Sequence, residues 1–374
     1  MRSLSQFCPA LSALKYFFVA ERAGQNLTVT MHLGKKDIKN FTPEELRKEL
    51  KRISEPSYRA EQIFYWIYKK GVFDFEAMKN MPEALREKLA QNYSIGTVRL
   101  YERLKSNDGT EKFIFELEDK NFIEGVLIPA GKRKTMCVST QVGCKYACLF
   151  CASGLNGFKR DLTASEILSQ ILYLQHKLNH RITNFVFMGM GEPLDNYENV
   201  ARVIKIMNSP KASGIAARRI TVSTCGIIPG VERFKELGLQ ANLSISLHAS
   251  NNTLRNRLMP VNKKYPLDEL IRACEKYITK SGRMITLEYI LLKDTNDNQV
   301  DIAGLASIAK RLNAKVNIIP YSPIAKIDFT APTKSDIRIF KDSLVRKGIK
   351  VTVRESKGKD IMAACGQLAG SITT

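Results

Sequence analysis

The sequence predicts an α/β protein, in which a partial (β/α)6 barrel follows a small helical N-terminal domain. Between residues 135 and 321, β-branched apolar runs alternate with amphipathic helical stretches, a pattern typical of a parallel sheet covered by helices. Between residues 42 and 93, helical periodicity dominates. Barrels of this kind place functional groups at the carboxyl ends of their strands, so candidate site residues are expected there.

The chain divides into five segments by composition and pattern. We predict an unpatterned arm at residues 1–38, a helical accessory domain at 39–93 and a β linker at 94–129. A core domain at 130–357 and a C-terminal tail at 358–374 follow. In the accessory domain, Thr42 and Glu45 form a capping box, and Pro43 occupies the first helical position. Further helices are predicted over residues 58–71 and 81–93.

The linker and the core are predicted from alternation and turn signals. A turn at Asn107–Gly109 separates two linker strands. Core strands are predicted at residues 135–141, 183–190, 218–224, 239–248, 284–292 and 315–321, with a final strand at 349–356. The intervening helices are predicted at residues 163–178, 199–208, 267–278 and 300–312.

Charge and cysteine content limit the class of protein. The chain has 58 Lys and Arg against 37 Asp and Glu, a formal net charge of +21 that favours a polyanionic partner such as nucleic acid. Eight cysteines in 374 residues are too few for a secreted disulfide scaffold. No apolar run approaches the roughly 20 residues that cross a bilayer. We expect a cytoplasmic protein without membrane association, with thiols available for metal binding or catalysis.

Four of the eight cysteines lie in the stretch MCVSTQVGCKYACLFCASG. Cys144, Cys148 and Cys151 form C-x3-C-x2-C, and three thiolates from one loop could hold three irons of a [4Fe–4S] cluster while leaving the fourth iron open. A structural zinc would need a fourth ligand, for which Cys137 and His248 are candidates. The spacing favours the cluster and leaves zinc as an alternative.

Further polar motifs follow the predicted strands. Gly189–Glu192, Ser223, Ser246–His248 and Tyr321–Ser322 come at or directly after strand ends. Because the carboxyl ends of parallel strands meet at one edge, these residues are expected to lie near the cysteine loop. The glycines would permit close approach of the backbone to a ligand, and Glu192 could accept a hydrogen bond from an ammonium group.

Taken together and in this order, these motifs resemble the radical S-adenosylmethionine superfamily, in which the open iron chelates that cofactor. The stretches CVSTQVGC, GMGEPLDN, ISLHAS, LMPVN and DIMAACGQLAG narrow the resemblance to the RlmN/Cfr family of RNA adenine methyltransferases. The resemblance extends from about Phe41 to Gly370, and ACGQL is its most specific element. It implies the superfamily's partial barrel, one [4Fe–4S] cluster on the three cysteines, and two S-adenosylmethionine molecules per turnover.

The resemblance implies catalytic roles for three residues. Cys365 corresponds to the cysteine that is first methylated and whose S-methyl group, after loss of a hydrogen atom, adds to an adenine ring carbon. Cys137 corresponds to the resolving cysteine, which releases the base by forming a transient disulfide with Cys365. Glu124 corresponds to the acceptor of the ring proton, although its sequence context alone indicates a solvated strand carboxylate.

The family's contacts to S-adenosylmethionine correspond to one set of residues here: Gly191, Glu192, Ser223, Ser246, Leu247 and His248. A further contact is usually an asparagine in a PYNP-like loop. This chain reads PYSP, so Ser322 takes that position. Serine can still donate and accept a hydrogen bond, but it is shorter than asparagine and lacks the second amide group.

The implied substrate is RNA: adenosine 2503 of 23S rRNA, methylated at carbon 2, with adenosine 37 of tRNA as a second substrate. Basic residues expected to flank the barrel mouth and contact RNA are Lys132, Arg133, Lys134, Lys159, Arg160, Arg218, Arg219, Arg255 and Arg257. In the accessory domain, Lys69 and Lys70 are expected to bind phosphate. The nearby aromatic residues Tyr65, Trp66 and Tyr68 are expected to lie in the core.

Two other functions remain open from the sequence. The first is methylation at carbon 8 of adenine, as in a Cfr-like enzyme. The second is a non-enzymatic RNA-binding protein with structural zinc, which would not need Cys137, Cys365 or the glycine-rich strand end. The resemblance also implies an electron donor such as a flavodoxin system and a monomeric enzyme.

Overall fold

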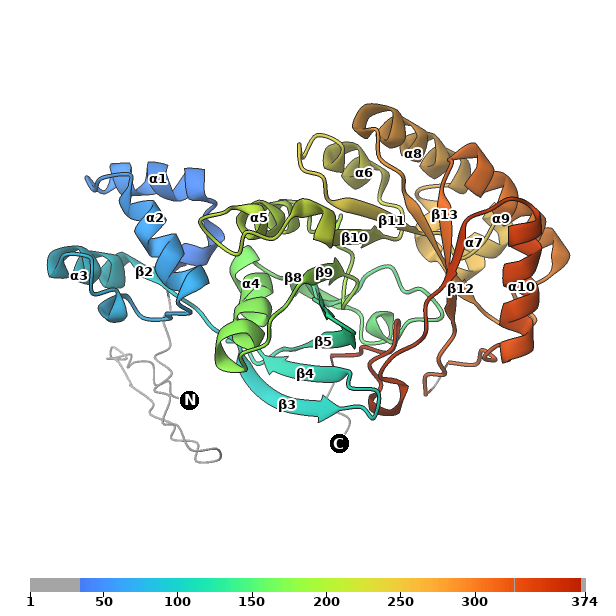
Figure 1. Ribbon diagram of the computed structural model, residues 1–374, viewed down its shortest axis with the longest axis horizontal. Coiled ribbons are helices and arrows are strands. Elements are labelled where there is room, and N and C mark those ends of the chain that lie inside the picture. The colour runs from blue at the N-terminus through green and yellow to red at the C-terminus, as the bar shows by residue number, and fades with distance from the viewer. Residues whose placement is uncertain (1–33, 326, 371–374) are drawn as a thin grey trace, which may run out of the picture. The chain divides into compact units, whose positions relative to one another are not determined.

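The computed structural model describes residues 34–325 and 327–370 (Figure 1). Most of the predicted N-terminal arm, residues 1–33, and the last four residues of the predicted tail lie outside the described residues. Within the described part, no helix is both long and apolar enough to span a membrane.

One ten-stranded sheet runs through the core, in the order β14-β13-β12-β11-β10-β9-β6-β5-β4-β3. Its strands from β6 to β14 are parallel. They are β6 (Arg133–Cys137), β9 (Asn184–Phe187), β10 (Ile220–Thr224), β11 (Asn242–Ser246), β12 (Thr286–Leu291), β13 (Lys315–Pro320) and β14 (Val351–Val353). The predicted partial barrel is confirmed, because each of the six predicted core strands is present.

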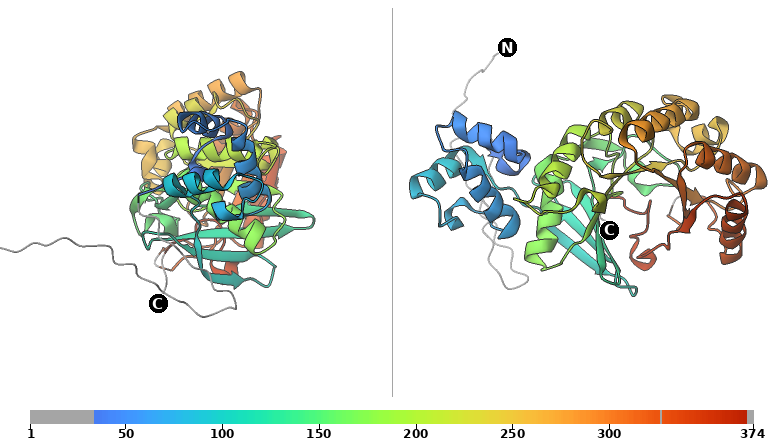
Figure 2. Two further views of the ribbon diagram at one scale, coloured as in Figure 1. Left: turned by 90° about the vertical axis from the view of Figure 1, so that its left-hand side faces the viewer. Right: turned by 45° about the horizontal axis from the view of Figure 1, so that its top comes forward.

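Helices lie on the outer side of the curved parallel sheet (Figures 1 and 2). They are α4 (Ala164–Leu172, continued by a π-helical segment, Tyr173–Lys177), α5 (Tyr197–Asn208), α6 (Ile228–Phe234), α7 (Asn252–Leu258), α8 (Leu267–Ser281), α9 (Gln299–Arg311) and α10 (Lys334–Arg346). The sequence did not predict α6 and α7, which are two turns long and too short to show a period. It also missed α10, although Thr333 and Asp336 form a capping box at its start.

The predicted β linker continues the same sheet. β3 (Arg99–Lys105), β4 (Glu111–Glu116) and β5 (Phe122–Ala130) form an antiparallel meander, and β5 pairs antiparallel with β6. The predicted turn at residues 107–109 joins β3 to β4 and is confirmed. A separate two-stranded hairpin, β7 (Gln141–Gly143) with β8 (Phe158–Asp161), follows β6.

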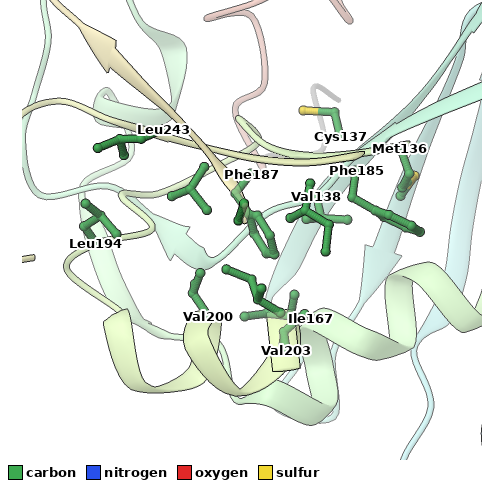
Figure 3. Packing of buried hydrophobic residues seen from close by; sticks show 14 of the residues in the cluster. Met136, Cys137, Val138, Ile167, Phe185, Phe187, Leu194, Val200, Val203 and Leu243 are labelled. Atoms are coloured by element: carbon green, nitrogen blue, oxygen red, sulfur yellow. The ribbon is translucent and has the colours of Figure 1, made fainter. Parts of the chain in front are cut away.

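Alternation along β6 separates the hydrophobic core from the barrel interior. Val138 and Phe187 are buried and pack with Val200 beneath the sheet, toward the helices (Figure 3). The Cys137 side chain points to the other side of the sheet (Figure 3). Burying such apolar side chains contributes roughly 1.5–3 kcal/mol each, so the helix-facing side anchors the strand while the opposite side is free for function.

The accessory domain has the predicted helices. They are α1 (Pro43–Arg52), α2 (Arg59–Phe64, continued by a π-helical segment, Tyr65–Lys69) and α3 (Glu83–Asn92), beside a parallel pair of β1 (Lys36–Asp37) and β2 (Tyr93–Ser94). The capping box at Thr42 is present. Single 3-10 turns occur at Ile38–Asn40, Phe75–Ala77, Ala152–Gly154, Ala217–Arg219, Pro260–Lys263 and Lys359–Ile361.

A buried lysine links the accessory domain to the barrel helices. The Lys39 side chain is fully buried, and its ammonium group donates to Ser165 Oγ and to the Gly96 carbonyl, each over 2.5 Å. Of the aromatic residues predicted to be in the core, Tyr68 is buried, whereas Tyr65 is 46% exposed. That part of the core prediction is wrong, because Tyr65 lies on the outer side of the helical segment.

Candidate active site

A short hairpin closes the cysteine loop, residues 144–157. At its base, the Cys144 amide donates to the Gly157 carbonyl over 3.1 Å. Gly143 has a φ of +74°, and a side chain at this position would collide with the same carbonyl. The hairpin between β7 and β8 therefore requires glycine at position 143, and the loop that it closes carries all three cysteines.

The three thiols of this loop lie close enough to interact electrostatically. Cys144, Cys148 and Cys151 are free and partly buried. Burial raises the pKa of Cys144 to about 12 and raises the pKa of the other two, and for Cys148 the neighbouring thiols raise it further. A cationic cluster would relieve this repulsion and let all three thiols ionise.

This donor set fits the predicted [4Fe–4S] cluster, in which each thiolate binds a separate iron. Within residues 34–325 and 327–370, no three His, Cys, Asp or Glu side chains converge closely enough to hold a single metal ion.

The glycine-rich segment after β9 packs against the strand that leads to the cysteine loop. A Cβ atom on Gly189 would lie 2.6 Å from the Val138 carbonyl oxygen. Gly191 has a φ of +93°, and a Cβ atom there would lie 2.8 Å from the Gln141 nitrogen. The glycines thus allow this segment to approach the protein's own backbone closely, at Val138 and Gln141.

Glu192 is buried at the end of this segment and orders two backbone amides. Its Oε1 accepts from the Leu194 amide over 2.9 Å, and its Oε2 accepts from the Cys225 amide over 2.7 Å. Burial raises the pKa of Glu192, and these hydrogen bonds oppose the rise. A carboxylate has about four acceptor positions, so Glu192 retains the capacity to accept from a ligand.

Two residues just beyond Glu192, for which no role was predicted, tie this segment to the cysteine loop and to the chain just before it. Asp195 accepts from the Tyr146 hydroxyl over 2.9 Å and lies 2.6 Å from the Lys145 ammonium group. Asn196 donates to the Thr140 carbonyl over 2.8 Å. Both residues end the stretch GMGEPLDN, so the motif itself was the signal that could have identified them.

Three serines present hydroxyl groups at the strand ends. Ser223 on β10 and Ser246 on β11 have their Oγ atoms 3.3 Å apart. Ser322, after β13, is buried, and its Oγ has no hydrogen-bond partner among the described residues. A buried hydroxyl without a partner is costly unless a ligand satisfies it. This feature fits the predicted cofactor contact at Ser322.

His248 lies between β11 and the cysteine loop. Its Nδ1 accepts from the Ile290 amide over 2.9 Å, and its ring packs edge-on against Phe150 with centroids 4.8 Å apart. Burial, with a contribution from Arg255, lowers the pKa of His248 to about 3. The ring is therefore neutral with its proton on Nε2, so this nitrogen can donate to a ligand but cannot coordinate a metal in this tautomer.

Arg255 was predicted to be a surface residue that contacts RNA, and that prediction is wrong. The side chain is fully buried. It donates to the Leu247 carbonyl over 3.1 Å, to the Cys225 carbonyl over 2.7 Å and to Asn262 Oδ1 over 2.8 Å. Arg255 therefore braces the ends of β10 and β11, where Leu247 also lies buried, and does not reach the surface.

The C-terminal tail, residues 358–370, docks beside the cysteine loop. The Ala152 amide donates to the Gly366 carbonyl over 2.7 Å, and Ser153 Oγ donates to the Leu368 carbonyl over 2.6 Å. These contacts connect positions more than 200 residues apart. They bring Cys365 next to the loop that carries the three cysteines.

Cys137 and Cys365 line one cavity of about 990 Å³ inside the barrel. Both thiols are free. Burial raises the pKa of Cys137 to about 12, the nearby Cys365 adds to this rise, and Arg354 opposes it. Cys365 in turn raises the pKa of Arg354, which lines the same cavity together with Glu288. The two cysteines that were predicted to form the transient disulfide thus line the same cavity as free thiols.

Glu124 on β5 is buried, with 2% of its surface exposed, so the interpretation as a solvated carboxylate is wrong. Its Oε1 accepts from the Ala369 amide over 3.0 Å and from the Gly370 amide over 2.6 Å. Its Oε2 lies 3.1 Å from the ammonium group of Lys112 on β4. Glu124 is therefore a direct partner of the C-terminal tail.

The cavity also reaches the amino ends of the parallel strands, where it is basic. Arg133, Arg219, Arg283 and Lys315 line it there. Arg133 and Arg219 were predicted to contact RNA, whereas Arg283 and Lys315 were not, although their positions at strand starts were an available signal. Arg160, also proposed for RNA, is instead bound to Glu166, with the charged groups 2.7 Å apart.

Family models match two parts of the chain. Residues 36–95 match the ribosomal RNA large subunit methyltransferase N-terminal domain, and residues 138–306 match the radical SAM superfamily. The first range covers the accessory helices, and the second begins at the end of β6 and includes the cysteine loop.

Similar proteins of known description cover nearly the whole chain. A protein of Clostridium novyi described as a probable dual-specificity RNA methyltransferase RlmN is 44% identical over 89% of this chain and 97% of its own length. One from Akkermansia muciniphila with the same description is 43% identical, covering 87% and 93%. The crystal structure of a radical SAM methyltransferase from Sphaerobacter thermophilus is 39% identical, with a TM-score of 0.85, and covers 90% of this chain and 100% of that chain.

Proposed function

Because the chain belongs to the RlmN family of radical S-adenosylmethionine RNA methyltransferases, we propose that it methylates carbon 2 of an adenine in RNA. As an enzyme of this family it uses one [4Fe–4S] cluster and two S-adenosylmethionine molecules per turnover. The proposed targets are adenosine 2503 of 23S rRNA and adenosine 37 of tRNA, and the relatives described as dual-specificity RNA methyltransferases support two kinds of target. Family membership overturns the alternative of a non-enzymatic zinc protein.

The observation that carries this proposal is the shared cavity of Cys137 and Cys365. One cysteine ends a barrel strand, the other lies on a tail that docks beside the cysteine loop, and both open into the same space. A methyltransferase that moved its methyl group directly from the cofactor to RNA would need neither thiol. Two reduced thiols in one cavity suit a methyl carrier and a residue that releases the product.

The residue types suit the chemistry of an unreactive carbon. Carbon 2 of adenine bears no lone pair, so it cannot attack a methyl sulfonium directly. The bound cluster and cofactor supply a radical that removes a hydrogen atom from a methyl group. In our proposal Cys365 carries that methyl group as a thioether, and the methylene carbon that remains after hydrogen loss forms a bond to carbon 2, so that it bridges the ring and the Cys365 sulfur. Once the ring proton has left, the Cys137 thiolate attacks the Cys365 sulfur, so that the S–S bond forms as the bond from this sulfur to the methylene carbon breaks. The methylene carbon takes up a proton and becomes the methyl group, and the one electron left over from the radical addition passes to the electron-transfer partner.

Glu124 is the proposed acceptor of the proton that leaves the ring carbon. Its Oε2 accepts no well-aligned hydrogen bond from the described residues, whereas Oε1 is bound by two tail amides. The Lys112 ammonium group lies 3.1 Å from Oε2, and a general base takes up a proton through an oxygen that is not already bound by a donor amide. Oε2 is therefore the oxygen that we assign to this step.

The cofactor contacts proposed from the family remain the strand-end residues. They are Gly191, Glu192, Ser223, Ser246, Leu247, His248 and Ser322. The neutral His248 and the unpartnered hydroxyl of Ser322 support it, because each can donate to a polar ligand. Cys144, Cys148 and Cys151 are the proposed cluster ligands.

The basic end of the cavity is the proposed entrance for the adenosine. Arg133, Arg219 and Lys315 are exposed at the amino ends of their strands, and the cavity runs from there to the two thiols. Cations at this end would bind the phosphates on either side of a flipped nucleotide, and RNA loops present unstacked bases at modest cost. Lys69 and Lys70 are exposed on the accessory domain, and we propose that they also bind RNA phosphates.

The test is mass spectrometry of a 23S rRNA fragment containing adenosine 2503, after anaerobic incubation with reconstituted enzyme, S-adenosylmethionine and a reductant. A methyl group at carbon 2 is expected with the unaltered chain and with Cys274→Ala, a buried cysteine of α8 used as the control. No product is expected with Cys365→Ala. A methyl group at carbon 8 would instead show a Cfr-like enzyme. If the protein holds its iron and cleaves the cofactor but methylates no RNA, the proposed substrate is wrong.

A further inference from the structure

Lys112 makes two contacts that no role described so far explains. It lies on β4, with only 9% of its side chain exposed. Its ammonium group is 3.1 Å from Glu124 Oε2 and donates to the Met362 carbonyl over 3.3 Å. One buried cation thus touches both the proposed proton acceptor and the backbone of the C-terminal tail.

Strand register explains why these groups meet. Val126 on β5 pairs with Lys112 on β4 and with Cys137 on β6. Paired residues share a face of the sheet, and Glu124 lies two residues from Val126, on that same face. Lys112, Glu124 and Cys137 are therefore side by side on the inner surface, under the docked tail.

The second oxygen of the Glu124 carboxylate also binds the tail. Glu124 Oε1 accepts from the Ala369 and Gly370 amides, which lie at the end of the described tail. Lys112 holds the tail at Met362, three residues before Cys365. The pair therefore grips the tail on both sides of the cysteine.

We infer that Lys112 is a positioning residue, which with Glu124 forms a clamp that holds the cysteine-bearing tail in the barrel. The clamp fixes Met362 through Lys112 and Ala369 and Gly370 through Glu124, so Cys365 is held between two anchors. The anchoring stands independently of the reaction, whereas its importance for methyl transfer rests on the proposed function.

Burial of a charge makes Lys112 more important than the tail's other contacts outside the clamp. Asp108 accepts from the Gly358 amide and Asp360 accepts from the Ser106 hydroxyl, but both carboxylates belong to exposed residues. The contact of Ser153 with the Leu368 carbonyl is between neutral groups. Removing one member of a buried ion pair leaves the other charge without its partner, which costs more than losing a neutral hydrogen bond. Without Lys112, the Glu124 carboxylate would be buried beside only the two tail amides, and the tail would lose its anchor at Met362.

The direct test is hydrogen exchange of the tail amides in the full chain, without RNA. Lys112→Met is expected to raise exchange at residues 362–370 by about tenfold or more, as expected for loss of a charged hydrogen bond. Lys112→Arg, which keeps the charge, should recover most of the protection. Arg103→Met is the control for loss of an ion pair at β4, because Arg103 pairs with Glu111, with the charged groups 2.7 Å apart, and makes no ion pair or hydrogen bond with the described tail.

Unchanged exchange in Lys112→Met, with the fold intact by circular dichroism, would overturn the clamp. So would equal increases in Lys112→Met and Arg103→Met, since these would show only a loosened sheet. The second readout is methyl loading of Cys365 in the absence of RNA, followed by mass spectrometry of the intact protein. We expect loading to fall about tenfold in Lys112→Met and to recover in Lys112→Arg. Loss of tail protection without any loading in the unaltered chain would keep the clamp and count against the proposed function.

Discussion

The cysteine loop and the C-terminal tail both bring cysteines to the barrel, but they are held in different ways. The loop is closed by its own hairpin, in which Cys144 and Gly157 are only thirteen residues apart. The tail has no strand of its own in the sheet, and it is held by side chains and amides from β4, β5, the turn between β3 and β4, and the cysteine loop.

This difference matches what each segment has to do in the proposed reaction. Cluster ligands must keep one geometry through every turnover, and a locally closed loop provides it. The methyl-carrying cysteine must meet the cofactor, the RNA base and Cys137 in turn, so it needs contacts that can be made and broken. A few hydrogen bonds and one ion pair, each worth about 1–3 kcal/mol, suit a segment that moves.

The largest expected effect comes from breaking the closure of the loop. In Gly143→Val, the side chain would collide with the Gly157 carbonyl, and its β-branched shape cannot adopt the positive φ. We expect the reconstituted protein to lose nearly all of its iron and sulfide, measured per chain. Gly157→Ala is the control, because its Cβ would meet no atom within 4 Å. That variant pays only the conformational cost of about 1 kcal/mol and should keep its cluster.

The second-largest effect is expected at Arg255, which braces the strand ends that carry the proposed cofactor contacts. Arg255→Met would leave the carbonyls of Leu247 and Cys225 without their donor, at a cost of about 3 kcal/mol. Urea unfolding should show this loss, and binding of S-adenosylmethionine should weaken with it. Arg257→Met, on the exposed side of the same helix, should change stability by less than about 0.5 kcal/mol. Equal effects of the two substitutions would contradict the brace.

The smallest expected effect is on a single contact of the tail. Ser153→Ala removes one neutral hydrogen bond to the Leu368 carbonyl, worth about 1 kcal/mol. Exchange of the tail amides should rise roughly fivefold, while iron content stays unchanged. Ser281→Ala, which removes a similar bond to the Tyr277 carbonyl in α8, should leave tail exchange unaffected. Loss of iron in Ser153→Ala would show that loop and tail are not held independently.

The same contrast decides what the sequence could predict. The cysteine spacing and the strand alternation are local patterns, so the loop and the six core strands could be predicted from them. The docking of the tail could not, because the contact between Glu124 and Ala369 joins residues 245 positions apart. Without it, Glu124 looked like a solvated strand residue and Lys112 had no visible role.

Basic residues show the same limit. Arg255 and Arg219 both lie near strand ends in the sequence, and both were expected at the barrel mouth. The structure buries Arg255 among backbone carbonyls and leaves Arg219 exposed at the opposite end of the barrel interior. Sequence alone does not tell whether an arginine has carbonyl partners inside the fold or water outside it.

The central claim is that Cys365 carries the methyl group and that Cys137 releases the product. The most direct measurement is mass spectrometry of Cys137→Ala after anaerobic incubation with RNA, S-adenosylmethionine and a reductant. The proposed mechanism predicts a covalent complex in which the RNA adenine is joined through one carbon to Cys365, because the thiol that breaks this bond is missing. Free methylated RNA at the rate of the unaltered enzyme, with no covalent complex, would contradict the mechanism.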